Sequence, residues 1–254
     1  MARIITLHPA DQVRGRHSEG DAHDGSSPPA GVAKPVLLVN MPFAYLFRPA
    51  LTLTLLKGLL LERHIPAQLL YSNLHFAELI GPELYFDLST ETPDKFTFAA
   101  EWLFSGALFE QSASDQERYV NEILRSTSVP EALIRGVIGA RPKVAAFLDG
   151  CLQQVLAMRP AAVVFTTALQ QQFPALALAK RIKAASPSTL IALAGVDWEG
   201  AMAAEVVRRF SFVDAGIAGE PEMVVPDLIQ RYFAGRRFDH LQGVSTPGNV
   251  DQKA

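Results

Sequence analysis

The sequence contains a single cysteine, Cys151, among its 254 residues. One thiol excludes an internal disulfide, and it excludes any zinc site or iron-sulfur cluster that takes several thiolates from this chain. Proteins without disulfides are typical of a reducing compartment, so the cysteine content predicts a cytoplasmic protein.

An excess of charge of one sign is also absent. The 23 basic and 26 acidic residues give a formal net charge of -3. This balance gives no large positive potential that would bind a polyanion, so we predict that nucleic acid is not a partner. No run approaches the roughly 18 apolar residues needed to cross a bilayer, so we predict no membrane partner either.

Several familiar catalytic and phosphate-binding motifs are missing. The sequence has no glycine-rich phosphate loop after a strand, no G-x-S-x-G elbow, no H-E-x-x-H and no pair of histidines at metal spacing. Asp21-Ala-His23 looks like the start of the D-x-H-x-x-G motif that supplies a histidine to cobalt, but Ser26 stands where glycine is required. The match also precedes the first predicted strand, so we reject it.

The ordered part of the sequence alternates short apolar runs with amphipathic stretches. Continuous apolar runs are typical of strands that are buried on both faces of a parallel sheet. Helical patterns follow them at 50–63, 173–185, 198–210 and 221–233, which predicts a doubly wound α/β fold. The five predicted strands are 35–40, 67–72, 161–167, 189–195 and 212–219.

The domain organisation follows from composition. Residues 1–34 are rich in Gly, Ser, Pro and charge and are predicted to be a flexible leader, and 246–254 a flexible tail. The α/β domain spans 35–245, and the segment 74–158 is too long for an ordinary crossover. Its pattern predicts a helical insertion with helices at 96–109, 115–125, 130–138 and 143–158. The insertion either packs on one face of the sheet or forms a docking surface for a partner.

Ligands of open α/β sheets bind at the carboxyl ends of the strands, near the point where the winding reverses. Four loops follow strands there. The first is aromatic and nearly uncharged, the second carries adjacent hydroxyls and glutamines, and the third and fourth combine glycine with an acid. The candidate cofactor-binding residues are Asn40, Met41, Pro42, Phe43, Tyr45, Thr166, Thr167, Leu169, Gln170, Gly195, Val196, Asp197, Gly219 and Glu220.

Structural roles compete with ligand binding in each loop. Phe43, Tyr45 and Phe47 could fill the sheet edge or the insertion instead of facing a ligand. Asp197 and Glu199 suit the capping of the following helix, and Glu222 lies in the first turn of the last one. Two threonines and three glutamines at one strand end exceed what capping needs, so the second loop favours ligand contact.

Taken in order, these loops resemble the cobalamin-binding domain of cobalamin-dependent radical SAM enzymes, in the branch that matures ribosomally made peptides. The resemblance covers about residues 35–245. The matching strings are VLLVNMPFAYLFRPALTLTLLKGLL, YSNLHFAELIG, EWLFSGALF, FTTALQQQFPALALAKRIK, LAGVDWEGAM and FVDAGIAGEPE.

The resemblance implies a Rossmann-like sheet with cobalamin across its carboxyl edge. Thr167-Ala168-Leu169 stands where many cobalamin domains carry Ser-x-Leu, and Ala194-Gly195 stands where many carry Gly-Gly. The missing D-x-H-x-x-G implies that no histidine ligates cobalt, so that residues 41–47 would form the lower wall of the site. Trp198 stands where a smaller residue is expected.

The radical SAM core requires C-x-x-x-C-x-x-C, which a chain with one cysteine cannot supply. The resemblance therefore implies a cobalamin-binding module, related to the radical SAM C-methyltransferases that mature peptides, that is not catalytic alone. Its expected partner is a radical SAM core protein or a precursor peptide. The alternative is a degenerate interaction protein on the same fold that binds a peptide or a partner enzyme. A nucleotide enzyme or phospho-receiver is disfavoured, because phosphate-binding glycines and an acidic cluster at the strand ends are lacking.

Overall fold

The structure is a computed structural model that describes residues 34–90, 97–126, 129–168 and 170–252. These residues belong to one compact unit, Ala33–Ala254. The predicted leader, apart from Lys34, and the rejected Asp21-Ala-His23 motif lie outside the described residues. Within the described ranges, no helix is both long and apolar enough to span a membrane.

The predicted doubly wound α/β class is confirmed. The sheet has the order β2-β1-β3-β4-β5-β6, and β1 to β5 run parallel, which is the flavodoxin-like winding with its reversal between β1 and β3. The prediction missed a sixth, antiparallel edge strand, which pairs with β5. The strands are β1 (Val36–Asn40), β2 (Ala67–Tyr71), β3 (Ala162–Thr166), β4 (Leu190–Ala194), β5 (Ala215–Ile217) and β6 (Val244–Ser245).

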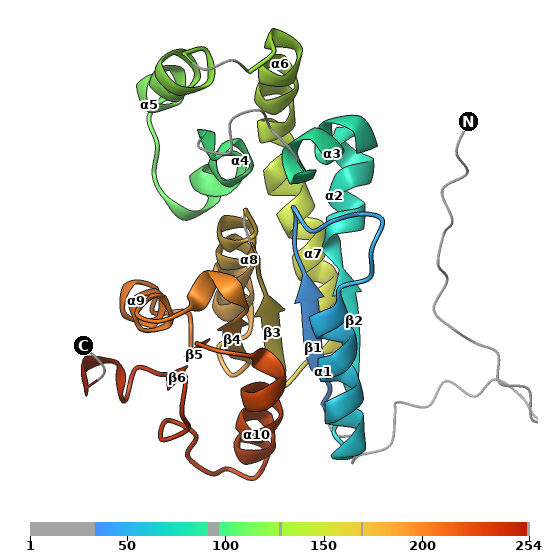
Figure 1. Ribbon diagram of the computed structural model, residues 1–254, viewed down its shortest axis with the longest axis vertical. Coiled ribbons are helices and arrows are strands. Elements are labelled where there is room, and N and C mark those ends of the chain that lie inside the picture. Colours follow the sequence, from blue (N-terminus) through green and yellow to red (C-terminus); the bar gives the residue numbers. More distant parts are fainter. Residues whose placement is uncertain (1–33, 91–96, 127–128, 169, 253–254) are drawn as a thin grey trace, which may run out of the picture. The chain divides into compact units, whose positions relative to one another are not determined.

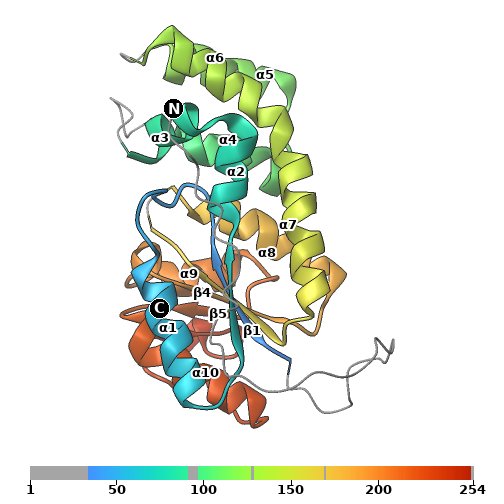
Figure 2. The ribbon, with the colours of Figure 1, turned by 90° about the vertical axis from the view of Figure 1, so that its right-hand side faces the viewer.

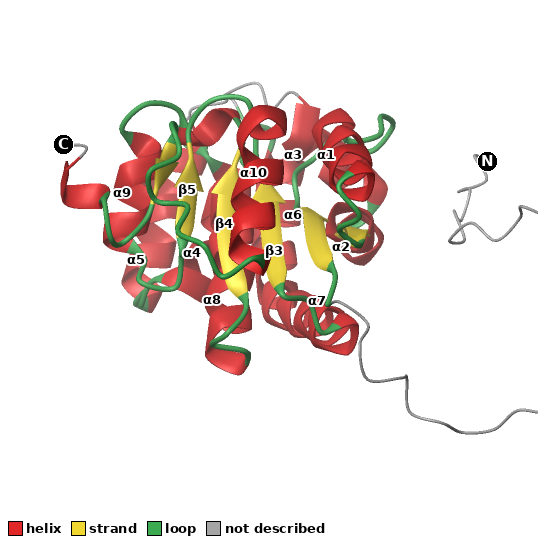
Figure 3. Ribbon diagram, turned by 90° about the horizontal axis from the view of Figure 1, so that it is seen from below, coloured by secondary structure: helices red, strands yellow, loops and turns green. Residues whose placement is uncertain are grey.

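The central strands are apolar throughout because both faces of the sheet are covered. In β1, Leu37 and Val39 belong to one core and Val36 and Leu38 to the other, as the period of two requires. Figures 2 and 3 show helices on both sides of the sheet. One face packs against α1 (Leu51–Glu62) and α10 (Pro221–Phe233), and the other against α7 (Val144–Met158), α8 (Gln172–Ala185) and α9 (Met202–Arg209).

The insertion is helical, as predicted, and lies beyond the carboxyl ends of the strands (Figure 1). Two of its helices were not predicted, α2 (Ser72–Ile80) and α3 (Pro82–Thr90). The predicted helix 115–125 is divided into an α-helical part and a π-helix. The remaining elements are α4 (Ala99–Leu108), α5 (Ala113–Arg118), the π-helix Tyr119–Leu124, α6 (Glu131–Ala140) and the short 3-10 helices Arg141–Lys143, Val196–Trp198 and Val250–Gln252.

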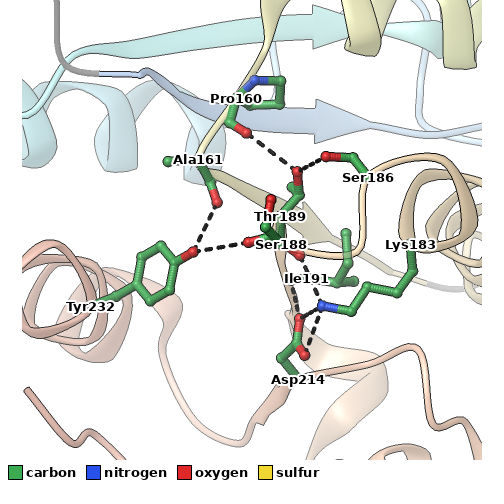
Figure 4. Close-up of polar contacts among 9 residues, drawn as sticks. All are labelled: Pro160, Ala161, Lys183, Ser186, Ser188, Thr189, Ile191, Asp214 and Tyr232. Atoms are coloured by element: carbon green, nitrogen blue, oxygen red, sulfur yellow. Dashed lines mark hydrogen bonds and ion pairs between the residues drawn. The ribbon is translucent and has the colours of Figure 1, made fainter. Parts of the chain in front are cut away.

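A cluster of polar contacts, drawn in Figure 4, lies at the amino-terminal ends of β3, β4 and β5. The Asp214 carboxylate accepts hydrogen bonds from Lys183 Nζ at 2.7 Å and from the Ile191 backbone N–H at 2.7 Å. The Tyr232 hydroxyl donates to the carbonyls of Ala161 and Ser188. These contacts join α8, α10 and the starts of β3 and β4, and they define the amino-terminal edge.

The polar residues after β6 are packed, although the sequence predicts a flexible tail from Thr246. Asn249 is only 7% exposed. Its side chain accepts from the Thr246 N–H at 2.7 Å and donates to the Val244 carbonyl at 3.0 Å. These bonds close a turn around β6, so the segment up to Asp251 belongs to the domain.

Candidate functional site

A crevice of about 290 Å³ lies at the carboxyl ends of β1, β3, β4 and β5. We call it the strand-end crevice. It opens at the reversal between β1 and β3, where doubly wound folds bind ligands. Its lining is Asn40, Ala44, Tyr45, Arg48, Pro49, Ala50, Leu51, Thr52, Thr166, Thr167, Ala168, Gln171, Gly195, Val196, Glu199, Gly219, Glu220 and Pro221.

Three adjacent polar side chains at the floor of the crevice make no hydrogen bond of standard geometry to the described part of the chain. Asn40 is 4%, Thr166 9% and Thr167 4% exposed. Among the described residues none of the three side chains makes a hydrogen bond, and Thr167 Oγ1 is fully buried. Buried polar groups are nearly always hydrogen-bonded, so their neighbours in this crevice should be a ligand or ordered water.

The charges at the mouth of the crevice are mixed. Arg48 lies 5.2 Å from the ring centre of Tyr45, while Glu199 and Glu220 line the opposite wall. Glu199 Oε1 accepts a hydrogen bond from the Gly219 N–H at 3.1 Å. One cation against two carboxylates does not favour a bare phosphate, so the arrangement suits a ligand that is mainly neutral and rich in hydrogen-bonding groups.

Gly195 is required by the backbone around it. Its φ of 111° and ψ of 176° lie in a region that only glycine occupies readily. A Cβ atom at this position would lie 2.2 Å from the Thr167 carbonyl oxygen. The glycine therefore lets the loops after β3 and β4 touch, and its presence is explained without a ligand.

The first loop divides between two environments. Met41, Pro42 and Phe43, which were predicted to bind the cofactor, are buried and do not line the strand-end crevice. The Phe43 ring instead lies 5.7 Å from that of Phe76 and 5.2 Å from that of Tyr85, inside the insertion. The alternative that Phe43 fills the insertion is the one the structure shows.

The other predicted site residues are distributed as follows. Tyr45, Val196, Gly219 and Glu220 line the strand-end crevice beside the three polar side chains and Gly195. Asp197 and Gln170 do not line it, and Leu169 lies outside the described residues. Burial raises the pKa of Asp197, while the side chains of Thr167 and Gln172, which lie near its carboxylate, lower this pKa by less. Thr167 Oγ1 makes no hydrogen bond of standard geometry with the carboxylate.

A second cavity, of about 520 Å³, lies between the insertion and the start of α8. We call it the insertion cavity, and it shares no lining residue with the strand-end crevice. Its lining is Leu88, Ser89, Thr90, Phe98, Glu101, Trp102, Ser105, Gln111, Tyr119, Gln170, Gln172 and Phe173.

Glu101 is a functional candidate that the sequence reasoning missed. It is 8% exposed, and its two carboxylate oxygens accept from the backbone N–H groups of Gln172 at 3.2 Å and Phe173 at 2.8 Å. An insertion side chain thus caps the first turn of α8. The sequence does hold one sign of a special role for Glu101, because it is the only acid in the apolar string AAEWLF. Burial raises the pKa of Glu101 from its ordinary 4.5 to about 7, against the opposing effect of the two N–H groups.

Protonation of Glu101 should make the stability of the fold depend on pH. A carboxyl whose pKa is higher in the folded than in the unfolded state stabilises the fold below pH 4.5, and this stabilisation is lost as the pH rises through 7. A pKa difference of this size corresponds to about 3 kcal/mol. Urea unfolding should show that the free energy of unfolding declines between pH 4.5 and 8, and Glu101→Gln should largely remove this decline.

Exposed Glu83, in the first turn of α3, provides the control. The pH dependence of Glu83→Gln should match that of the unmodified protein. An identical decline in Glu101→Gln would show that Glu101 does not carry the effect.

Comparisons with known proteins leave the family open. No model of a protein family matches the chain, and no curated protein matches it. A solved structure of the radical S-adenosylmethionine methyltransferase TsrM from Kitasatospora setae, with tryptophan substrate and the SAM analogue aza-SAM bound, is a weak neighbour. The TM-score is 0.39 at 13% identity, and the match covers 84% of this chain and 28% of that one. Values this low support no functional argument.

Proposed function

We propose that the strand-end crevice binds a cobalamin. The observation that carries the proposal is a row of three buried polar side chains at the β1/β3 reversal, those of Asn40, Thr166 and Thr167, which make no hydrogen bond of standard geometry to the described residues. Cobalamin carries amide groups around its ring and a polar nucleotide tail, which offer both donors and acceptors to such a row. The resemblance of the loop sequences to cobalamin-binding domains supports the same ligand.

The donor set fits cobalamin in part. No histidine is present among the described residues that line the crevice. The crevice is smaller than a whole corrinoid, so it would enclose only a portion, with the remainder against exposed apolar side chains at its rim. Val196 is 67% exposed and Leu51 70% exposed, and both line the crevice.

Bound cobalamin would supply a cobalt centre able to carry a methyl group. The role proposed for this chain is to hold and orient that cofactor. Its single thiol, on Cys151, is buried in α7, and burial raises the thiol pKa to about 11. Radical chemistry would therefore require cluster-binding cysteines from outside these 254 residues, and the proposed partners are a radical SAM core protein and a precursor peptide.

Retention of corrinoid tests the proposal. We expect the protein, incubated anaerobically with hydroxocobalamin and then desalted, to keep a roughly stoichiometric corrinoid spectrum. Thr52→Trp should abolish retention, because Thr52 is half-buried on α1 and lines the crevice. Thr54→Trp is the matched control, since Thr54 is exposed on the same helix and does not line it. Absence of corrinoid from the unmodified protein would refute the proposal.

The alternative, an interaction protein that binds a peptide or a partner enzyme, is supported by an exposed aromatic ridge. The Phe47 ring lies 5.9 Å from that of Tyr45 and 6.1 Å from that of Phe86. Phe47 is 73% and Phe86 42% exposed. Exposed aromatic side chains in contact with one another are common at binding surfaces. Peptide binding that depends on Phe47, in a protein that retains no corrinoid, would favour this alternative.

A further inference from the structure

The junction between the β3–α8 loop and α8 separates two cavities, and its three consecutive glutamines alternate between them. Gln171 lines the strand-end crevice, while Gln170 and Gln172 line the insertion cavity. Gln171 is itself fixed, since its Oε1 accepts from the Ala168 N–H at 3.0 Å. The insertion cavity is therefore a separate compartment on the far side of this loop, and the proposed cobalamin leaves it unexplained.

The insertion cavity has the size and lining of a small-molecule site. Its volume of about 520 Å³ lies within the range typical of ligand pockets. Four aromatic rings contribute to its wall, those of Phe98, Trp102, Tyr119 and Phe173. The Trp102 and Tyr119 rings are stacked, with centres 4.7 Å apart and planes at 9°.

A π-helix places Tyr119 in this wall. Tyr119 is the first residue of the π-helix Tyr119–Leu124, and its hydroxyl donates to the Thr97 carbonyl. Segments of π-helix are rare and are found frequently at functional sites. The departure from α-helical geometry thus coincides with the aromatic wall of the cavity.

Glu101 is the only side chain with a formal charge among the described residues that line the cavity. The two backbone N–H groups of α8 use one acceptor position on each carboxylate oxygen, and each oxygen has a second. The Arg141 guanidinium lies against the same wall, 3.9 Å from the centre of the Trp102 ring, and donates to the Trp102 carbonyl and to Gln111 Oε1, not to Glu101. No basic side chain among the described residues forms an ion pair with Glu101. A buried carboxylate in this state favours a cationic donor.

We propose that the insertion cavity binds an organic ammonium, with its charged group at the Glu101 carboxylate and its apolar body among the four aromatic rings. Aromatic faces and a carboxylate together are suited to an ammonium group. The site is independent of the proposed cobalamin, because the two cavities share no lining residue.

Phenethylamine is a suitable probe, with 2-phenylethanol and 3-phenylpropionate as its neutral and anionic counterparts. Calorimetric titration of the full chain, without corrinoid, should show saturable binding of phenethylamine. The alcohol should bind at least about tenfold more weakly, and the carboxylate not measurably. This ordering is expected because only the amine can form a charge pair with the Glu101 carboxylate. A tenfold difference in affinity corresponds to about 1.4 kcal/mol.

Two variants and one control locate the binding. Glu101→Gln should lose about tenfold in affinity for phenethylamine and leave that for the alcohol unchanged, while Glu83→Gln, on α3, should alter neither. Ser89→Trp places an indole in the cavity from half-buried Ser89 and should abolish binding of both compounds. Circular dichroism checks that each variant is folded.

Three results would overturn the proposal. The first is no binding of phenethylamine at millimolar concentration, and the second is binding no tighter than that of the alcohol. The third is full binding by the folded Ser89→Trp variant. The titrations contain no corrinoid, so failure of the cobalamin proposal would leave these results interpretable.

Discussion

Replacing Phe43 with alanine should lower the free energy of unfolding by about 3–5 kcal/mol, the range for removing a buried phenylalanine side chain. Phe43 is 4% exposed, and its ring contacts the rings of Phe76, Tyr85 and Phe104. These partners come from α2, α3 and α4, so the change would open a cavity where the first loop joins three insertion helices. Urea unfolding followed by circular dichroism measures the loss.

Phe47, in the same loop, provides the matched control. Its side chain is 73% exposed, so Phe47→Ala should change the free energy of unfolding by no more than about 0.5 kcal/mol. Equal effects of the two substitutions would contradict the division of this loop into a buried anchor and an exposed ridge. The same pair separates stability from binding, because only Phe47 belongs to the proposed peptide-binding ridge.

The fold was largely predictable because its strands are apolar and its helices are regularly spaced. The prediction of the fifth strand at 212–219 was too long, since Phe212 packs against Phe210 and Asp214 pairs with Lys183. Only Ala215–Ile217 remains in the sheet. Strand β6 has two residues and carries no periodicity of its own. Its existence depends on pairing with β5 and on the turn that Asn249 closes.

Helix α2 shows a second limit of the sequence. It begins at Ser72 directly after β2, without an intervening loop and without a side-chain cap. The string YSNLHFAELIG therefore has no start signal between strand and helix. Packing of Phe76 against Phe104 and Phe147 supplies the stabilisation that local signals do not. Tertiary contacts of this kind decide where helices begin when capping is absent.

The edge of the sheet that holds the candidate site was predictable, but the direction of each side chain was not. Strand ends predicted that Asn40, Thr166 and Thr167 would meet, and they do. Whether Phe43 faces the crevice or the insertion depends on aromatic partners more than 30 residues away along the chain. Glu101 was missed for the same reason, because its partners are backbone N–H groups at the start of α8.

Gly195→Ala should destabilise the protein by about 3–5 kcal/mol or prevent folding. Alanine would have to adopt a backbone conformation that suits only glycine, and its methyl group would clash with a neighbouring backbone atom. The added methyl group would lie 2.2 Å from the Thr167 carbonyl oxygen, a backbone atom that cannot rotate away. Gly58→Ala, on α1, has open space and should stabilise by about 0.5–1 kcal/mol.

If Gly195→Ala lowers the free energy of unfolding and Gly58→Ala raises it, the role of Gly195 is in the contact between the loops that follow β3 and β4. A folded Gly195→Ala protein of normal stability that had lost corrinoid would instead assign Gly195 to the ligand. For this reason cobalamin binding is tested at Thr52, where a large side chain can be added without disturbing the strand ends. The crevice then depends on Gly195 for its shape, and the proposal assigns its hydrogen bonds to the ligand to Asn40, Thr166 and Thr167.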